Sequence, residues 1–223
     1  MPTPMRDPLT RDRILVTALA LIDAEGLERL TMRRLGQALG VEAMALYNHV
    51  AGKEEIVSGA VALVMAELEP VPADLPWKEA LRRRAMAFHR ALRRHPWAAG
   101  QMMNPARIVE PRLAWMDAVL GTLREAGCSV ELAHHGFHIL ESHIIGSSLW
   151  LNSIVAPTTG GESPAALVDS PPFDRYPWLG EHMRYHLHLD GSPGGHEDAD
   201  ARSTFELGLE MILDGIERLR AAP

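Results

Sequence analysis

A glycine between two short helical patterns constrains this chain more than any other feature. Residues 31–49 read TMRRLGQALGVEAMALYNH, and Gly40 divides them into two segments. Thr31 is placed to cap the first segment. Two helices joined by a tight glycine turn are typical of the helix-turn-helix, whose second helix lies in the major groove of DNA. The apolar residues whose helical spacing predicts the inward side of both segments are Leu35, Leu39, Leu46 and Val50.

Composition limits the other possibilities. The chain has 223 residues, of which 47% are hydrophobic and 23% charged, and these proportions are ordinary for a globular protein. No apolar run approaches the roughly 20 residues that span a bilayer, and the N-terminus has no continuous apolar core. We therefore expect neither a membrane segment nor a signal peptide. Cys128 is the only cysteine, which excludes an intramolecular disulfide and favours the cytoplasm.

The rest of the chain shows helical periodicity and lacks the alternating β-branched pattern of strands. We predict an all-α fold of about nine to ten helices, with a three-helix helix-turn-helix domain at residues 1–52. A larger domain for ligand binding and dimerisation follows at residues 53–223, and its helix at 53–69 connects the two. The other predicted helices lie at 10–26, 77–94, 111–126, 129–155, 176–188 and 202–219, with a short irregular or helical piece at 98–103.

The predicted helix at 77–94 is strongly basic, with six arginines. A second nucleic-acid site would explain them. The favoured explanation is that these arginines are solvated on a surface helix or paired with acidic residues of the larger domain.

The second segment of the helix-turn-helix presents small, apolar and polar residues outward. Small residues let a helix approach base edges closely, methyl groups suit thymine, and an Asn suits adenine. Tyr, His and Lys side chains suit phosphates. A corner of an ordinary three-helix bundle is the alternative, but the cap, the turn and the inward residues all favour DNA binding. The outward residues and the start of the next helix are Ala43, Met44, Ala45, Tyr47, Asn48, His49 and Lys53.

The stretch ALALIDAEGLERLTMRRLGQALGVEAMALYNHVAGKEEI resembles the DNA-binding region of the tetracycline-repressor family, and the resemblance covers residues 10–65. In the repressor that gives the family its name, a Gln-Pro-Thr run and a Trp fill positions 43–45 and 48, so we expect a different operator sequence here. The resemblance implies phosphate contacts from Thr31, Tyr47, His49 and Lys53. It also implies base reading by Arg33, Ala43, Met44, Ala45 and Asn48.

The resemblance extends less sharply to the regulatory domain of the same family. It implies that Met102 stands where the namesake repressor has a metal-binding His, and that Arg84 stands where it has an Asn that contacts the drug. Phe88 is kept. A metal–tetracycline site is therefore not expected.

The predicted helices at 129–155 and 202–219 are apolar over more than one stripe, so a single chain would leave one face exposed. Two copies packed as a four-helix bundle would bury those faces and present two recognition helices to successive major grooves. We expect a homodimer that a charged residue at Ile145 or Ile212 would weaken. The predicted interface residues are Ile145, Gly146, Leu149, Leu209, Ile212 and Ile216.

A small-molecule cavity is expected between helices of the larger domain, because such sites are mostly apolar with a few polar groups. A lining rich in Met suits an apolar or aromatic effector. Ordinary core packing is the alternative for each candidate residue. The candidates are Arg84, Phe88, Trp97, Met102, Met103, Trp115, Phe137, His138, Glu141 and Trp150.

Two histidine groups have the helical spacing of metal ligands. A polar cavity, the dimer seam or an exposed surface is the alternative, and we expect neither a metal nor another cofactor. No Gly-x-Ser-x-Gly elbow and no phosphate loop is present, so we do not expect an enzyme. The two groups are His134, His138 and Glu141, and His182 and His186.

These patterns and the resemblance predict a ligand-responsive transcriptional regulator. The favoured form is a repressor that binds a palindromic, double-stranded operator as a homodimer and is released by a small molecule. A metal sensor that uses the His134 group is one alternative. A regulator without a small-molecule effector is the other.

Overall fold

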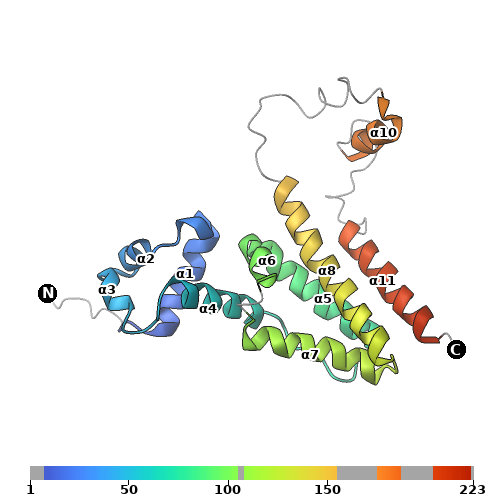
Figure 1. Cartoon of the computed structure of the whole chain (residues 1–223), viewed down its shortest axis with the longest axis horizontal. Helices are drawn as coiled ribbons and strands as arrows, with labels where there is room; N and C mark the ends of the chain where they lie inside the picture. The colour runs from blue at the N-terminus through green and yellow to red at the C-terminus, as the bar shows by residue number, and fades with distance from the viewer. Residues whose placement is uncertain (1–7, 105–107, 155–174, 187–202, 222–223) are drawn as a thin grey trace.

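Helices form the regular structure of the part of the chain that is described. This computed structural model describes residues 8–104, 108–154, 175–186 and 203–221 (Figure 1). No strand occurs among these residues, which confirms the predicted all-α fold. None of the helices within them is long and apolar enough to cross a membrane. The helices are α1 (Arg11–Glu25), α2 (Met32–Leu39), α3 (Ala43–Leu46), α4 (Lys53–Ala66), α5 (Trp77–Arg94), α6 (Pro96–Met102), α7 (Glu110–Glu125), α8 (Val130–Ile154), α10 (Pro177–His186) and α11 (Thr204–Ala221), and a 3-10 turn (Leu27–Arg29) joins α1 to α2.

The observed helix bounds agree with the predicted ones within a few residues at most positions, and two differ for clear reasons. The third helix was expected to reach Val50, but α3 ends at Leu46. His49 N donates to Leu46 O over 2.9 Å, three residues back, which is the bonding of a tight turn. The short piece expected at 98–103 is a helix that begins at Pro96. Proline is favoured in the first turn of a helix because the backbone N–H groups there have no acceptor within the helix. The N–H that proline lacks is therefore not needed.

Two threonines start the first helices, and a glycine joins α2 to α3. Thr10 Oγ1 accepts a hydrogen bond from Arg13 N at 3.2 Å, and Thr31 Oγ1 accepts one from Arg34 N at 3.1 Å. Gly40 has a φ of 69°, in the left-handed region that favours glycine. The cap and the turn predicted from the sequence are therefore both present.

Helix α4 contributes side chains to two hydrophobic cores. Its first half packs Ile56, Val57 and Ala60 against α1, α2 and α3. Its second half packs Val64 and Met65 against the core of the larger helical body. Helix α4 therefore contacts both cores. The connector role of residues 53–69 stays a prediction.

Helices α5, α7, α8 and α11 surround the larger core. Helix α11 runs beside α8 at the edge of the bundle (Figure 1). Arg82 on α5 forms two hydrogen bonds with Glu210 on α11, at 2.6 and 2.7 Å. Arg83 also pairs with Glu79 at 2.9 Å. Pairing with acidic residues, rather than a second nucleic-acid site, thus explains part of the basic character of α5.

Candidate DNA-binding surface and ligand cavity

The surface around α3 presents side chains outward from one buried anchor. Leu46 is fully buried, and it holds α3 against the N-terminal core. Met44 has 75% of its surface exposed and Tyr47 has 49%. Asn48 and His49 are exposed beside them. These four side chains are free to reach base edges and phosphates, as the predicted DNA contacts require.

The other predicted DNA contacts flank this face. Ala43 and Ala45 are half-buried on α3, so their small side chains allow a close approach to a groove. Arg33 on α2 is exposed, and so is Thr31, the residue that caps that helix. The structure brings all of these residues to one end of the molecule.

An acidic residue orders the turn that carries Lys53. Glu55 Oε2 accepts a hydrogen bond from Ala51 N at 2.7 Å, and Arg11 Nε donates to Glu55 Oε1 at 3.0 Å. The Ala51 amide, and then Arg11, hold the pKa of Glu55 below its usual value. Lys53 Nζ lies 3.5 Å from the Leu27 carbonyl oxygen. Lys53 therefore stands at the first turn of α4, where the helix dipole favours a phosphate.

Gly36 sets the separation of α2 and α3, a role that the sequence prediction missed. A Cβ at this position would lie 2.9 Å from Val41 O and 3.2 Å from Ala43 N. Val41 N also donates to Gly36 O at 3.0 Å. A larger side chain would push α3 away from α2 and tilt the exposed face. The signal that could have revealed this role is a glycine inside a helical pattern.

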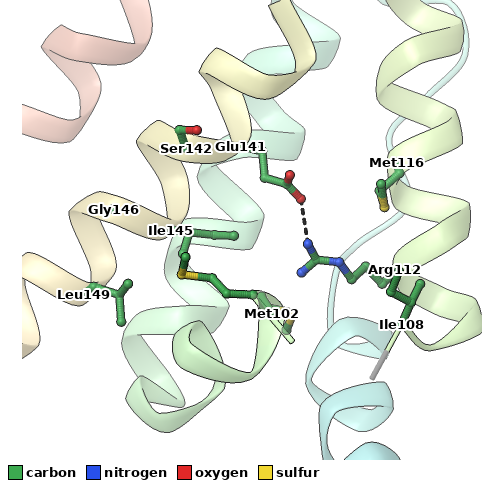
Figure 2. Close-up of a pocket in the computed structure, with 10 residues that line it drawn as sticks. Met102, Ile108, Arg112, Met116, Glu141, Ser142, Ile145, Gly146 and Leu149 are labelled. Carbon is green, nitrogen blue, oxygen red and sulfur yellow. Dashed lines mark hydrogen bonds and ion pairs between the residues drawn. The ribbon is translucent and has the colours of Figure 1, made fainter. Parts of the chain in front are cut away.

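A cavity of about 480 Å³ lies between α6, α7 and α8 (Figure 2). This volume falls within the range of small-molecule sites. Most of its walls are apolar, and methionine side chains adapt to ligands of irregular shape. The lining residues are Met102, Met103, Ile108, Arg112, Met116, Glu141, Ser142, Ile145, Gly146 and Leu149.

A buried ion pair lies in the wall of this cavity. Arg112 on α7 is only 8% exposed, and its Nη2 donates to Glu141 Oε1 on α8 at 2.8 Å (Figure 2). The Nε and Nη1 atoms of Arg112 have no hydrogen-bond partner among the described residues. Burial lowers the pKa of Arg112, and Glu141 offsets part of that effect. The guanidinium therefore has N–H groups that an acceptor oxygen in the cavity could bind.

Three of the predicted lining residues reach this cavity, namely Met102, Met103 and Glu141. Three others form an aromatic cluster inside the core instead. The ring centroids of Phe88 and Trp115 are 4.9 Å apart, and those of Trp115 and Phe137 are 6.3 Å apart. All three side chains are buried. Phe88 and Trp115 pack edge to face, and Trp115 and Phe137 are tilted by 56°. These contacts stabilise the core, which was the stated alternative for the three residues.

The remaining four predicted lining residues lie outside the α6–α8 cavity, and two of them line other cavities. Arg84 lines two cavities beside α5 and α7, of about 190 and 530 Å³. Trp150 lines a third cavity, of about 620 Å³, beside α5 and α11. Trp97 is half-buried between the two cores, and His138 is exposed on α8. Helical spacing alone did not show which face of each helix turns toward the same cavity.

The predicted dimer residues also divide into two groups. Leu209, Ile216 and Ile145 are between 1% and 7% exposed, and all three pack inside the core of their own chain. Since their surface is already covered, the structure corrects their assignment to an interface. A charge at Ile145 would disrupt the subunit itself. Of the other three, Gly146 and Leu149 are exposed and line the α6–α8 cavity, whereas Ile212 is half-buried.

The metal-sensor alternative gains no support. The His134 and His138 rings are 4.6 Å apart and both residues are exposed, but Glu141 is paired with Arg112 in the cavity wall. Within the described ranges, no group of three or more His, Cys, Asp or Glu side chains is arranged to hold a metal ion. The second pair includes His186, whose side chain lies outside the described part.

A hydrogen-bonded junction joins α6 to the N-terminal core, and the sequence prediction missed it. His95 Nδ1 lies 2.8 Å from Asp23 Oδ1 on α1, and His95 Nε2 lies 3.0 Å from Glu67 Oε1. Trp97 Nε1 donates to the same Asp23 oxygen at 2.8 Å. The partners are far apart in the sequence, so no local pattern indicates the junction. The sequence around Pro96 predicted only the end of a helix.

Two family comparisons cover most of the chain. Residues 14–60 match the family described as bacterial regulatory proteins, tetR family. Residues 69–220, more than half of the chain, match the tetracyclin repressor-like C-terminal domain. The chain belongs to the tetracycline-repressor family. The helix-turn-helix and the larger helical body are the two parts of that family's fold.

Several members of the tetracycline-repressor family are similar to this chain, and the matched region covers a different share of each. The transcriptional repressor DrrR1 of Streptomyces coeruleorubidus is 34% identical over 65% of this chain and 56% of the relative. The class D tetracycline repressor of Escherichia coli is 28% identical over 94% of this chain and 89% of the relative's length. For the first three curated relatives, the matched region spans 56 to 62% of the relative's length.

Solved structures of the family show the same fold. ActR of Streptomyces coelicolor in complex with actinorhodin has a TM-score of 0.74 and 30% sequence identity, over 97% of this chain and all of that one. A possible family member from Streptomyces coelicolor A3(2) has a TM-score of 0.75 and 28% identity, over 94% of this chain and 99% of its own.

Proposed function

We propose that this chain is a ligand-responsive transcriptional repressor, which binds a palindromic operator as a homodimer and is released by a small molecule. Two relatives serve as precedents, because DrrR1 is a transcriptional repressor and ActR binds actinorhodin. In this chain, the exposed face of α3 supports DNA binding. The cavity between α6, α7 and α8 supports the binding of an apolar or aromatic effector.

One observation carries the proposal, namely that α6 contacts both sites. Its C-terminal end supplies Met102 to the wall of the cavity, and Met103 follows directly. Its N-terminal end supplies Trp97, whose indole donates to Asp23 on α1. His95, directly before α6, contacts the same Asp23. A ligand that displaces α6 must therefore change the contacts that hold the DNA-binding end.

The release of DNA follows from a difference in affinity. A ligand shifts a conformational equilibrium only by as much as it prefers one conformation over the other. In this mechanism, the effector binds more tightly to a conformation in which α6, and with it α1 and α4, is displaced. The two α3 helices of the dimer then no longer match successive major grooves, which are about 34 Å apart. Operator binding and effector binding therefore oppose each other.

Exposed apolar residues on α8 and α11 support a dimer. On α11, Leu207, Met211 and Leu219 are 52 to 66% exposed and lie on one side of the helix, at multiples of four residues. On α8, Ile139 and Trp150 are 54% and 51% exposed. A chain alone would leave these surfaces in water, whereas a two-fold partner would cover them. We therefore still propose a four-helix interface formed by α8 and α11 of both subunits. Its contacts come from these exposed residues rather than from the buried Ile145, Leu209 and Ile216.

The volume of the cavity favours this function over a regulator without an effector. A cavity too small for a ligand would have supported that alternative. The α6–α8 cavity holds about 480 Å³, enough for a molecule of drug size.

The proposal is tested by selecting DNA from a random library with the purified full-length chain. We expect a palindrome whose half-sites are centred about one helical turn, or a multiple of it, apart. We also expect specific binding at least about a thousandfold tighter than binding to random DNA. Enrichment of no sequence, or binding by the monomer to a single half-site alone, would contradict the proposal.

A further inference from the structure

Arg112 is the one positively charged side chain among the described residues that line the α6–α8 cavity, and its position is unusual. It is 92% covered by the protein, since 8% of its surface is exposed. An arginine this deeply buried is normally paired through most of its five N–H groups. Here only Nη2 has a partner among the described residues, and that partner is Glu141.

The missing pairing has an energetic consequence. A buried donor without an acceptor destabilises the folded chain, and more so when the group is charged. Figure 2 shows the guanidinium of Arg112 directed from α7 into the space between Met102, Ile145 and Met116. Since these neighbours are apolar, they offer Nε and Nη1 no acceptor. A molecule that fills the cavity could supply the acceptor for them.

We propose that the effector carries an acceptor oxygen on an apolar ring system, and that the Nε and Nη1 groups of Arg112 bind this oxygen. This inference rests on the proposed function, because it names the chemistry of the molecule that would release the DNA. The oxygen belongs to a carboxylate, a sulfonate or phenolate, or a neutral carbonyl, all of which accept hydrogen bonds from a guanidinium. The methionine and isoleucine side chains of the cavity hold the rings.

Glu141 limits the charge of the ligand. Its carboxylate already neutralises Arg112, so an anionic ligand adds a second negative charge to the wall. A neutral carbonyl meets no such repulsion. Removing the charge of Glu141 should therefore strengthen the binding of an anion more than that of a neutral ketone.

Three fluorescent probes test the inference, because they share a naphthalene ring and differ in their oxygen groups. Anilinonaphthalene sulfonate carries an anionic acceptor, the naphthyl ketone prodan carries a neutral one, and phenylnaphthylamine carries no oxygen. Dissociation constants are measured with the full-length chain and with Arg112→Met, whose side chain keeps much of the length. We expect Arg112→Met to weaken the oxygen-bearing probes roughly tenfold or more and to leave phenylnaphthylamine within about twofold.

The pattern of losses decides the result. Loss for the sulfonate alone supports an anionic effector, and loss for the sulfonate and the ketone supports any acceptor oxygen. Equal loss for all three probes, or no loss for any, overturns the inference. The control is Arg93→Met, which changes an arginine in the separate cavity beside α5 and α11. Loss of sulfonate binding in Arg93→Met but not in Arg112→Met also overturns the inference.

A second variant keeps the test decisive if Arg112→Met fails to fold. Glu141→Gln retains an acceptor for Arg112, and it should tighten sulfonate binding several-fold relative to prodan. An unchanged ratio would contradict the inference. DNA binding by the unsubstituted chain is measured separately. Sequence-specific DNA binding with probe binding that does not depend on Arg112 overturns only this inference, whereas absence of specific DNA binding overturns the proposed function.

Discussion

The Trp97 indole on α6 donates a hydrogen bond to Asp23 Oδ1 on α1 over 2.8 Å. This contact crosses from the larger helical body to the DNA-binding end, and His95 Nδ1 lies 2.8 Å from the same Asp23 oxygen. The two ends of α6 therefore serve different sites, since Met102 at the far end lines the cavity. A movement of α6 by even a fraction of a turn would alter the contacts at Asp23.

The Trp97–Asp23 contact should have a measurable energy. We expect a double-mutant cycle of Trp97→Phe and Asp23→Ala to give a coupling energy of about 1–2 kcal/mol, because the acceptor is a carboxylate and hydrogen bonds to charged groups are stronger than neutral ones. Urea unfolding measures it. Effects of the two substitutions that add within about 0.3 kcal/mol would show that the contact does not couple the two parts.

Lys53 should act on all DNA sequences alike. Its position at the first turn of α4 places it to contact a phosphate. We expect Lys53→Ala to weaken binding to specific and random DNA by similar factors, and to reduce the slope of log K against log salt by about 1. Fluorescence anisotropy over a range of salt concentrations measures both. Lys78→Ala is the matched control, because Lys78 pairs with Glu217 at 2.8 Å on the opposite side of the molecule and should leave the slope unchanged.

Asn48 should instead set base preference. It is exposed beside α3, and the Asn amide can pair with adenine. We expect Asn48→Ala to cost about 1–3 kcal/mol on the selected operator and to relax the preference at one base pair of each half-site. Repeating the DNA selection with the variant shows this directly. An unchanged consensus with uniformly weaker binding would place Asn48 on the phosphate backbone.

The DNA-binding end could be predicted from the sequence because its signals are local. The Thr31 cap, the Gly40 turn and the buried Leu46 each depend on neighbours only a few residues away. The family resemblance then predicted roles for the outward residues, and these stay predictions. The one error there, the length of α3, concerns a helix end, where the hydrogen-bond pattern changes over a single turn.

The cavity could not be predicted in the same way. Its wall depends on which faces of α6, α7 and α8 turn toward one another, and the residues of its ion pair are 29 positions apart in the sequence. Periodicity identifies apolar faces, but it does not separate a face that lines a cavity from one that fills a core. This is why Phe88 and Trp115 were expected in the cavity and pack inside the core instead. Arg112 was not among the predicted residues, because its burial depends on the contact between α7 and α8, which no local pattern shows.

The dimer interface should be sensitive to a charge on the exposed side of α11. Met211 is 66% exposed, so Met211→Glu leaves the core of the subunit intact. We expect this variant to sediment as a monomer at micromolar concentration and to bind the palindrome at least about tenfold more weakly, because a charge at the centre of an apolar interface is costly. Leu209→Asp, on the buried side of the same helix, should unfold the chain instead. If the Met211→Glu protein remains a dimer, the interface must lie on another surface of the chain.

A buried histidine should make stability depend on acid. The His89 ring stacks on Phe205 with centroids 3.8 Å apart and an interplanar angle of 6°, and His89 is 6% exposed. Burial, and then the nearby Arg93, lower the pKa of His89 to about 4. Between pH 6.5 and pH 4 the unfolded chain therefore binds more protons at this site than the folded chain. Stability should fall across this window as the pH decreases.

The variant His89→Phe tests this directly, because it keeps an aromatic ring beside Phe205 and removes the titrating group. We expect the unsubstituted chain to lose up to about 3 kcal/mol more than the variant between pH 6.5 and pH 4, from the size of the pKa shift. Above pH 7 the free energies of unfolding of the two proteins should differ by a constant amount. The variant loses the contact of 3.5 Å between His89 Nδ1 and Ser148 Oγ, which contributes to this difference. Urea unfolding at a series of pH values gives both curves. Parallel curves over the whole range would mean that His89 is protonated in the folded chain at the same pH as in the unfolded one.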